Sequence, residues 1–141
     1  MKLVAFVGAL VIATPLAVSA QQQSAAPAVP PGFEIPKDMT TYYVALYVRG
    51  PKFTESESPE HMALTRRHLA YIRQMIEQKK FLLAGPLLDG GDKLGLAIVA
   101  STSADEAKRI AEGDPTIAAG HMAIELHPAM LPSLASLVVK Y

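Results

Sequence analysis

The sequence predicts a single α+β domain, in which a four-stranded antiparallel sheet carries two helices on one face. From residue 40 onward, segments with strand and helix periodicity alternate in the order β-α-β-β-α-β. The segment DGGD, residues 89–92, marks a tight hairpin between the two middle strands. With 141 residues, of which 50% are hydrophobic, the chain suits one core of ordinary size. This order is typical of the ferredoxin-like arrangement, which leaves one sheet face uncovered.

The first 20 residues have the layout of a cleavable secretory signal peptide. Lys2 precedes an apolar run from residue 3 to residue 13, and the segment ends in the small-residue pattern Val18-Ser19-Ala20. The run is shorter than the ~20 apolar residues that a membrane-spanning helix needs. We therefore expect cleavage after Ala20, a periplasmic or secreted protein, and no stable membrane anchor in the mature chain.

The rest of the chain begins with a tether and lacks the features of several protein classes. Residues 21–39 are rich in Gln, Ala and Pro without periodicity, which predicts an extended tether before a domain at residues 40–141. The absence of cysteine excludes disulfides, a lipid-modified cysteine and a thiol nucleophile. Loss of Lys2 leaves 12 basic against 13 acidic residues, and this near-neutral charge argues against a nucleic-acid partner.

The first strand is predicted over residues 40–50, TTYYVALYVRG, which are dense in β-branched and aromatic side chains. Alternation divides them into two sets. The first set, Tyr42, Val44, Leu46 and Val48, is expected to pack under the helices. The second set, Tyr43, Ala45, Tyr47 and Arg49, is expected on the uncovered face.

A helix is predicted over residues 58–80, with Ser58 as N-cap, Pro59 in the first turn and a lysine pair at its end. Residues 81–88 and 93–101 then form the two strands of the hairpin, and residues 101–114 form the second helix. In that helix Ser103 and Glu106 have the spacing of a capping box, and Gly113 ends the last turn.

The last strand is predicted over residues 121–127, HMAIELH. Its alternation directs three apolar side chains toward the helices, namely Met122, Ile124 and Leu126. The remaining side chains are expected on the uncovered face, namely His121, Ala123, Glu125 and His127.

His68 is the most informative residue of the first helix, because it occupies the apolar stripe four residues from both Leu64 and Ile72. A histidine in that place is either a hydrogen-bonded core residue or an acid–base catalyst. Asp114, directly before Pro115, also has two interpretations. It can cap the short turn that follows, or its carboxylate can orient the His68 ring.

The chain from about Tyr42 to Pro128 resembles the YCII-related family. The resemblance rests on the stretches YYVALYVRGPKFT, HLAYIRQMIEQKKFLLAGPLLDGGDKLG, SADEAKRIAEGDPTIAAG and IELHP. It implies a dimeric α/β-barrel-like assembly, in which the sheets of two subunits face each other, as in antibiotic-biosynthesis monooxygenases and muconolactone isomerases. It also makes His68 and Asp114 the counterparts of the histidine and aspartate that are proposed as the catalytic pair of the family.

These observations predict an exported acid–base enzyme of the lyase or isomerase type that acts on a small oxygenated substrate, cyclic substrates included. His68 and Asp114 would transfer the proton in an isomerisation, enolisation or elimination. The substrate would be held by five residues expected on the uncovered face, namely Arg49, Tyr43, Tyr47, Glu125 and His127. The alternative is that these residues are contacts between subunits or charges at the rim of the face. We expect a homodimer, as the resemblance implies. We expect no metal and no cofactor, since the sequence lacks an HExxH motif and a glycine-rich phosphate loop.

Two other interpretations remain open. One is a non-catalytic dimeric module of the same fold that binds a small ligand. The other is a structural domain in which His68 and Asp114 only fasten the second helix to the first.

Overall fold

The computed structural model describes residues 31, 32, 34 and 36–140. The expected signal peptide, residues 1–20, and most of the expected tether, residues 21–39, lie outside the described residues. Within the described part of the chain, no helix is both long and apolar enough to cross a membrane.

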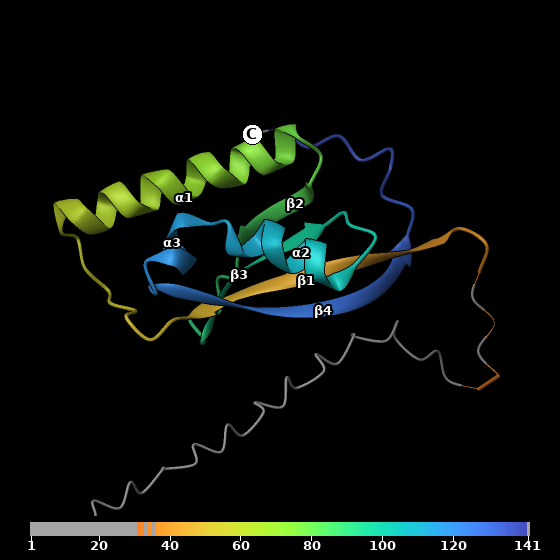
Figure 1. The fold of residues 1–141 in the computed structure, drawn as a ribbon, viewed down its shortest axis with the longest axis horizontal. Coiled ribbons are helices and arrows are strands. Elements are labelled where there is room, and N and C mark those ends of the chain that lie inside the picture. The colour runs from red at the N-terminus through yellow and green to blue at the C-terminus, as the bar shows by residue number, and fades with distance from the viewer. Residues whose placement is uncertain (1–30, 33, 35, 141) are drawn as a thin grey trace, which may run out of the picture.

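The domain is a ferredoxin-like α+β fold with one additional short helix (Figure 1). Its elements in chain order are β1 (Met39–Arg49), α1 (Pro59–Glu77), β2 (Phe81–Pro86), β3 (Lys93–Val99), α2 (Ala104–Glu112), α3 (Pro115–Ala118) and β4 (Met122–Pro132). The four strands lie in the order β2-β3-β1-β4, and every neighbouring pair is antiparallel. The predicted fold class and order of strands and long helices are confirmed.

The start of α1 agrees with the sequence signals, whereas its end differs in detail. The Ser58 side chain caps the helix by accepting a hydrogen bond from the backbone N–H of His61 at 3.2 Å. The helix ends at Glu77, so the lysine pair lies beyond it. Lys79 has a φ of 56°, and the N–H of Lys80 bonds to the carbonyl of Met75 at 2.9 Å. The first lysine of the pair thus takes the left-handed conformation that ends the helix.

The second helix is capped by half of the predicted capping box. Ser103 Oγ accepts a hydrogen bond from the backbone N–H of Glu106 at 3.2 Å. The Glu106 carboxylate instead accepts a hydrogen bond from Ser101 Oγ at 2.8 Å.

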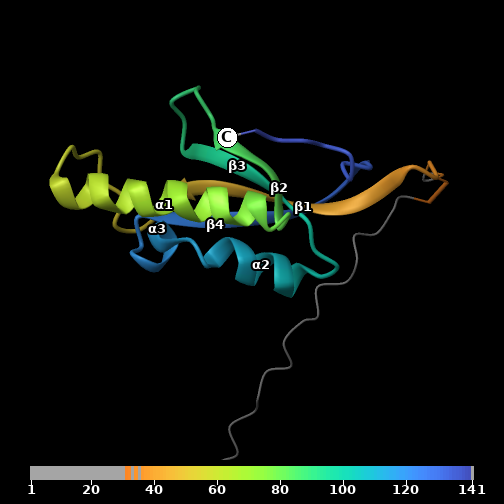
Figure 2. The same cartoon turned by 90° about the horizontal axis from the view of Figure 1, so that it is seen from above.

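Figure 2 shows α1 over the strands with α2 alongside. The Tyr71 hydroxyl of α1 links the two helices by donating a hydrogen bond to the Ile110 carbonyl of α2.

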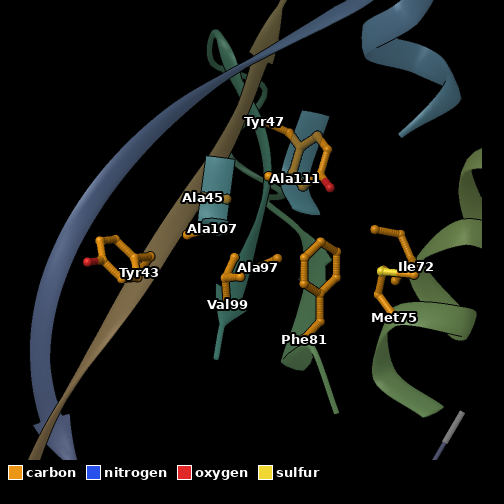
Figure 3. Packing of buried hydrophobic residues seen from close by; sticks show 10 residues of the cluster. All are labelled: Tyr43, Ala45, Tyr47, Ile72, Met75, Phe81, Ala97, Val99, Ala107 and Ala111. Carbon is orange, nitrogen blue, oxygen red and sulfur yellow. The ribbon is translucent and has the colours of Figure 1, made fainter. Parts of the chain in front are cut away.

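The core lies between the helices and one face of the sheet (Figure 3). It contains Tyr43, Ala45, Tyr47, Ile72, Met75, Phe81, Ala97, Val99, Ala107 and Ala111, all buried. On β1 the helices are therefore faced by Tyr43, Ala45 and Tyr47. The sequence pattern predicted this set on the uncovered face, so the predicted assignment of the two faces is reversed. The other set is only half-buried at Val44, Leu46 and Val48.

The reversal has a physical cause, because both faces of β1 are apolar and alternation alone does not select between them. Ala45, Ala107 and Ala111 are all fully buried. These small side chains let α2 approach the sheet closely.

The last strand has the predicted alternation but different bounds. Met122, Ile124 and Leu126 pack against the core as expected, and β4 continues to Pro132, which pairs with Met39. Glu125 and His127 pair with Leu46 and Val44, so they lie on the uncovered face, opposite to Tyr43 and Tyr47. The expectation that all these side chains share one face is wrong.

His121 is likewise not on the uncovered face. It precedes β4 and its exposed fraction is only 6%. Its ring contacts those of Phe53 and His61, with centroids at 4.9 and 4.7 Å. Burial and the neighbouring charge of His61 lower the pKa of His121.

Candidate active site

The central feature of the site is a short hydrogen bond between α1 and the loop that follows α2. His68 Nδ1 lies 2.6 Å from Asp114 Oδ2. The other carboxylate oxygen accepts hydrogen bonds from the backbone N–H of Thr116 at 2.9 Å and from its hydroxyl at 2.7 Å. Asp114 thus caps α3 and binds His68 at once, so both sequence-based interpretations of this residue describe its contacts.

Asp114 is ionised although it is completely buried. Burial opposes the negative charge, but hydrogen bonds from His68 and Thr116 outweigh it and hold the pKa of Asp114 below its ordinary value. An ionised carboxylate only accepts hydrogen bonds, so the proton of the contact belongs to His68 Nδ1. The neutral ring then keeps its lone pair on Nε2, where it can accept a proton from a ligand.

His68 borders a pocket of about 220 Å³ between α1 and the hairpin strands. The walls are mainly apolar and include Leu69, Ile72, Ala84, Pro86, Leu96 and Met122. The volume is below the ~300–1,000 Å³ that drug-sized ligands occupy. The side chain of His68 is 18% exposed, so the ring is sheltered but accessible.

The floor of the pocket depends on small residues where β2 and β3 run side by side. Gly85 and Gly95 both line it. A Cβ atom at Gly95 would lie 2.9 Å from the Gly85 carbonyl oxygen, so only glycine permits this approach of the strands. The AGP segment, residues 84–86, therefore contributes to the pocket rather than only ending the strand.

Tyr47 is the second polar side chain of the pocket. It is 3% exposed, and its ring meets the His68 ring edge-on at a centroid distance of 5.6 Å. Its hydroxyl completes no hydrogen bond of normal geometry within the described residues. Burial and the negative charge of Asp114 raise the pKa of Tyr47 far above its ordinary value. The Asp114 carboxylate is close enough to act on the hydroxyl as a hydrogen-bond acceptor as well.

The other predicted substrate-binding residues lie elsewhere. Arg49 pairs with Glu55 at 3.3 Å and stands over the Phe53 ring at 4.7 Å. Tyr43 is part of the core. Glu125 and His127 approach each other to 3.9 Å on the uncovered face. None of these four borders the pocket of His68, so of the predicted set the structure brings together His68, Asp114 and Tyr47.

Thr116 and the pocket walls were missed by sequence reasoning. The side chain of an aspartate N-cap commonly accepts a hydrogen bond from the backbone two residues on, so the segment DPT carried a usable signal for the contact with Thr116. The walls carried none, because they combine β2, β3 and β4 with α1. Among the described residues, no group of three or more His, Cys, Asp or Glu gathers in a way that could hold a metal ion.

Comparisons with known proteins give one family and several similar solved structures. A family model for the YCII-related domain matches residues 42–126, a range that includes Tyr47, His68 and Asp114. No curated protein matches the sequence. The chain is similar to 5-chloro-2-hydroxyhydroquinone dehydrochlorinase (TftG) from Burkholderia phenoliruptrix AC1100 in complex with 2,5-dihydroxybenzoquinone, with 24% identity and a TM-score of 0.44. The similarity covers 60% of this chain and 90% of that one.

Proposed function

Because the chain belongs to the YCII-related domain family, we propose that it is a small-molecule enzyme in which His68, oriented by Asp114, transfers a proton. The observation that carries the proposal is the 2.6 Å contact between His68 Nδ1 and a fully buried carboxylate, in the wall of an apolar pocket. The contact fixes the ring and its tautomer, which is what a general base requires.

The chemistry follows from the free nitrogen of His68. Nε2 can remove a proton from a carbon next to a carbonyl group, and the resulting imidazolium is stabilised by the Asp114 carboxylate. Return of the proton to another atom gives an isomerisation or an enolisation. Loss of a leaving group from the intermediate gives an elimination.

The pocket defines the substrate class. Its volume of about 220 Å³ and its mainly apolar walls fit a small compound, such as one ring with few substituents. A substrate must carry an oxygen that can accept the electrons left behind by the proton. We therefore propose small cyclic ketones, lactones and related oxygenated compounds.

A non-catalytic binding module is the second candidate. It is favoured by the same pocket, in which His68 and Tyr47 are the only side chains with polar groups among those that line it. A site of this composition can hold a ring by apolar contact alone.

The test is proton exchange in D₂O, followed by NMR on a panel of small cyclic ketones and lactones. We expect the mature protein, whose N-terminus after export should be Gln21, to accelerate deuterium incorporation into at least one compound. The variant His127→Gln should retain this activity, because His127 lies outside the pocket. Compounds that bind at the pocket but never exchange would establish the binding module instead.

The uncovered sheet face supports the further proposal of a homodimer. Val44, Leu46 and Val48 of β1 are half-buried on this face. Such an apolar face is typical of an interface between subunits.

Sedimentation analysis tests the dimer. We expect the mature protein to sediment at twice the chain mass and Leu46→Glu to sediment as a monomer, because a buried charge at the interface is unpaired. Leu88→Glu is the matched control, since Leu88 is 91% exposed in the hairpin loop. A wild-type protein that stays monomeric at high micromolar concentration would contradict the proposal.

A further inference from the structure

We propose that Tyr47 is a second catalytic residue, whose hydroxyl donates a hydrogen bond to the substrate oxygen that becomes negative when His68 removes a proton. The inference rests on the proposed function of the same pocket. It also narrows the substrate class to compounds that form an enolate or phenolate, because only these place an anionic oxygen beside the base.

The first argument is the hydroxyl without a completed hydrogen bond. Tyr47 is 3% exposed and lines the pocket of His68. Leaving a buried donor unsatisfied costs on the order of 1–3 kcal/mol, and such groups in folded proteins call for an explanation. An oxygen atom of a bound ligand would supply the missing acceptor.

The second argument concerns the protonation state of the hydroxyl. Burial and the nearby Asp114 charge raise the pKa of Tyr47 far above its ordinary value. The phenol therefore remains neutral at neutral pH. It cannot compete with His68 as a base, and it always has a proton to donate.

The third argument is the position of the two side chains. The Tyr47 and His68 rings pack edge-on, with an interplanar angle of 78°. One belongs to the middle of β1 and the other to the middle of α1, so both are held by rigid elements. A single small ligand can thus meet a base and a hydrogen-bond donor at once, which is the arrangement needed to stabilise an enolate.

The charges balance in this arrangement. The C–H proton goes to His68 Nε2, the C–H electron pair forms a C=C bond, and the carbonyl electron pair moves to oxygen. The new imidazolium faces the Asp114 carboxylate, and the new oxyanion accepts the Tyr47 hydrogen bond. No oxidant, reductant or further reactant is needed.

One competing role must be separated from this one. Asp114 also acts as an acceptor toward Tyr47, so the hydroxyl could serve only as a further donor to that carboxylate. His68 and Thr116 already supply three hydrogen bonds to it. A purely structural hydroxyl would affect stability and leave ligand affinity unchanged.

The test is the binding of 4-nitrophenol. This phenol mimics the proton transfer to His68 by giving up its hydroxyl proton, and the resulting phenolate oxygen can accept the hydrogen bond from Tyr47. Its phenolate form absorbs visible light. Tyr47→Phe keeps the ring and is expected to weaken binding about 10–100-fold, as for one hydrogen bond to a charged oxygen. Tyr43→Phe, a buried tyrosine of the same strand that does not border the pocket, should bind as the wild type does.

The outcomes separate this inference from the proposed function. Equal affinity in Tyr47→Phe and wild type, or no binding by the wild type, overturns the role of Tyr47. Tyr47-dependent binding without the phenolate absorbance would instead overturn His68 as the base. Should Tyr47→Phe fail to fold, 3-fluorotyrosine placed at position 47 supplies the test, because its more acidic hydroxyl should tighten binding and unchanged binding refutes the proposal.

Discussion

Replacing His68 with asparagine is expected to slow proton exchange on a substrate of this pocket by about 10²–10⁴-fold, the usual contribution of a positioned general base. The asparagine amide can occupy the place of Nδ1 and still donate to the Asp114 carboxylate. The buried charge stays hydrogen-bonded, whereas the nitrogen that accepts the proton is lost. Deuterium incorporation followed by NMR gives the rate directly.

His61→Asn is the matched control for this variant. His61 lies on the same helix, but it faces His121 and does not border the pocket. The control is expected to keep the wild-type rate. A His68→Asn protein that exchanges as fast as the control would show that His68 is not the base, whatever its contact with Asp114.

Replacing Asp114 with alanine is expected to lower the free energy of unfolding by about 3–5 kcal/mol, because three buried hydrogen-bond donors lose their acceptor. The change removes the acceptor of hydrogen bonds from His68 Nδ1 and from both donors of Thr116. It also removes the N-cap of α3. Urea unfolding measures the loss.

Asp114→Asn is the control for that prediction, since its oxygen can still accept both Thr116 hydrogen bonds. The two proteins should also differ in their response to acid. The pKa of Asp114 in the folded protein lies below the ordinary value of 3.8, which applies to the unfolded chain. The contribution of the Asp114 charge to stability is therefore complete at pH values above the unfolded pKa. It is lost as the pH falls from the unfolded pKa through the folded pKa. Wild type should therefore lose more stability in acid than Asp114→Asn, and parallel pH profiles would contradict the assigned charge.

The sequence was sufficient for the parts of the fold that depend on local signals. The cap at Ser58 and the hairpin at residues 89–92 fix their elements through contacts between near neighbours. His68 was found because it interrupts an apolar stripe, and Asp114 because it follows the second helix directly and precedes Pro115. Their partnership across the chain came from a family resemblance rather than from spacing.

The faces of the sheet could not be predicted in the same way. Tyr47 was placed on the uncovered face, because the aliphatic Leu46 set looked more suitable for a core. The choice was made by tertiary packing, in which α2 lies against small residues such as Ala45. A single strand with two apolar faces contains no information about that packing partner.

The position of β1 in the sheet has a consequence for folding. This strand is made first but lies between β3 and β4, and its first residue pairs with Pro132. Neither edge of β1 can be satisfied until later parts of the chain have been synthesised, and closing such long loops makes folding slower than in helical bundles of equal length. The pocket also includes Met122 of β4. A nascent chain that ends before this strand therefore has neither a complete sheet nor a complete site.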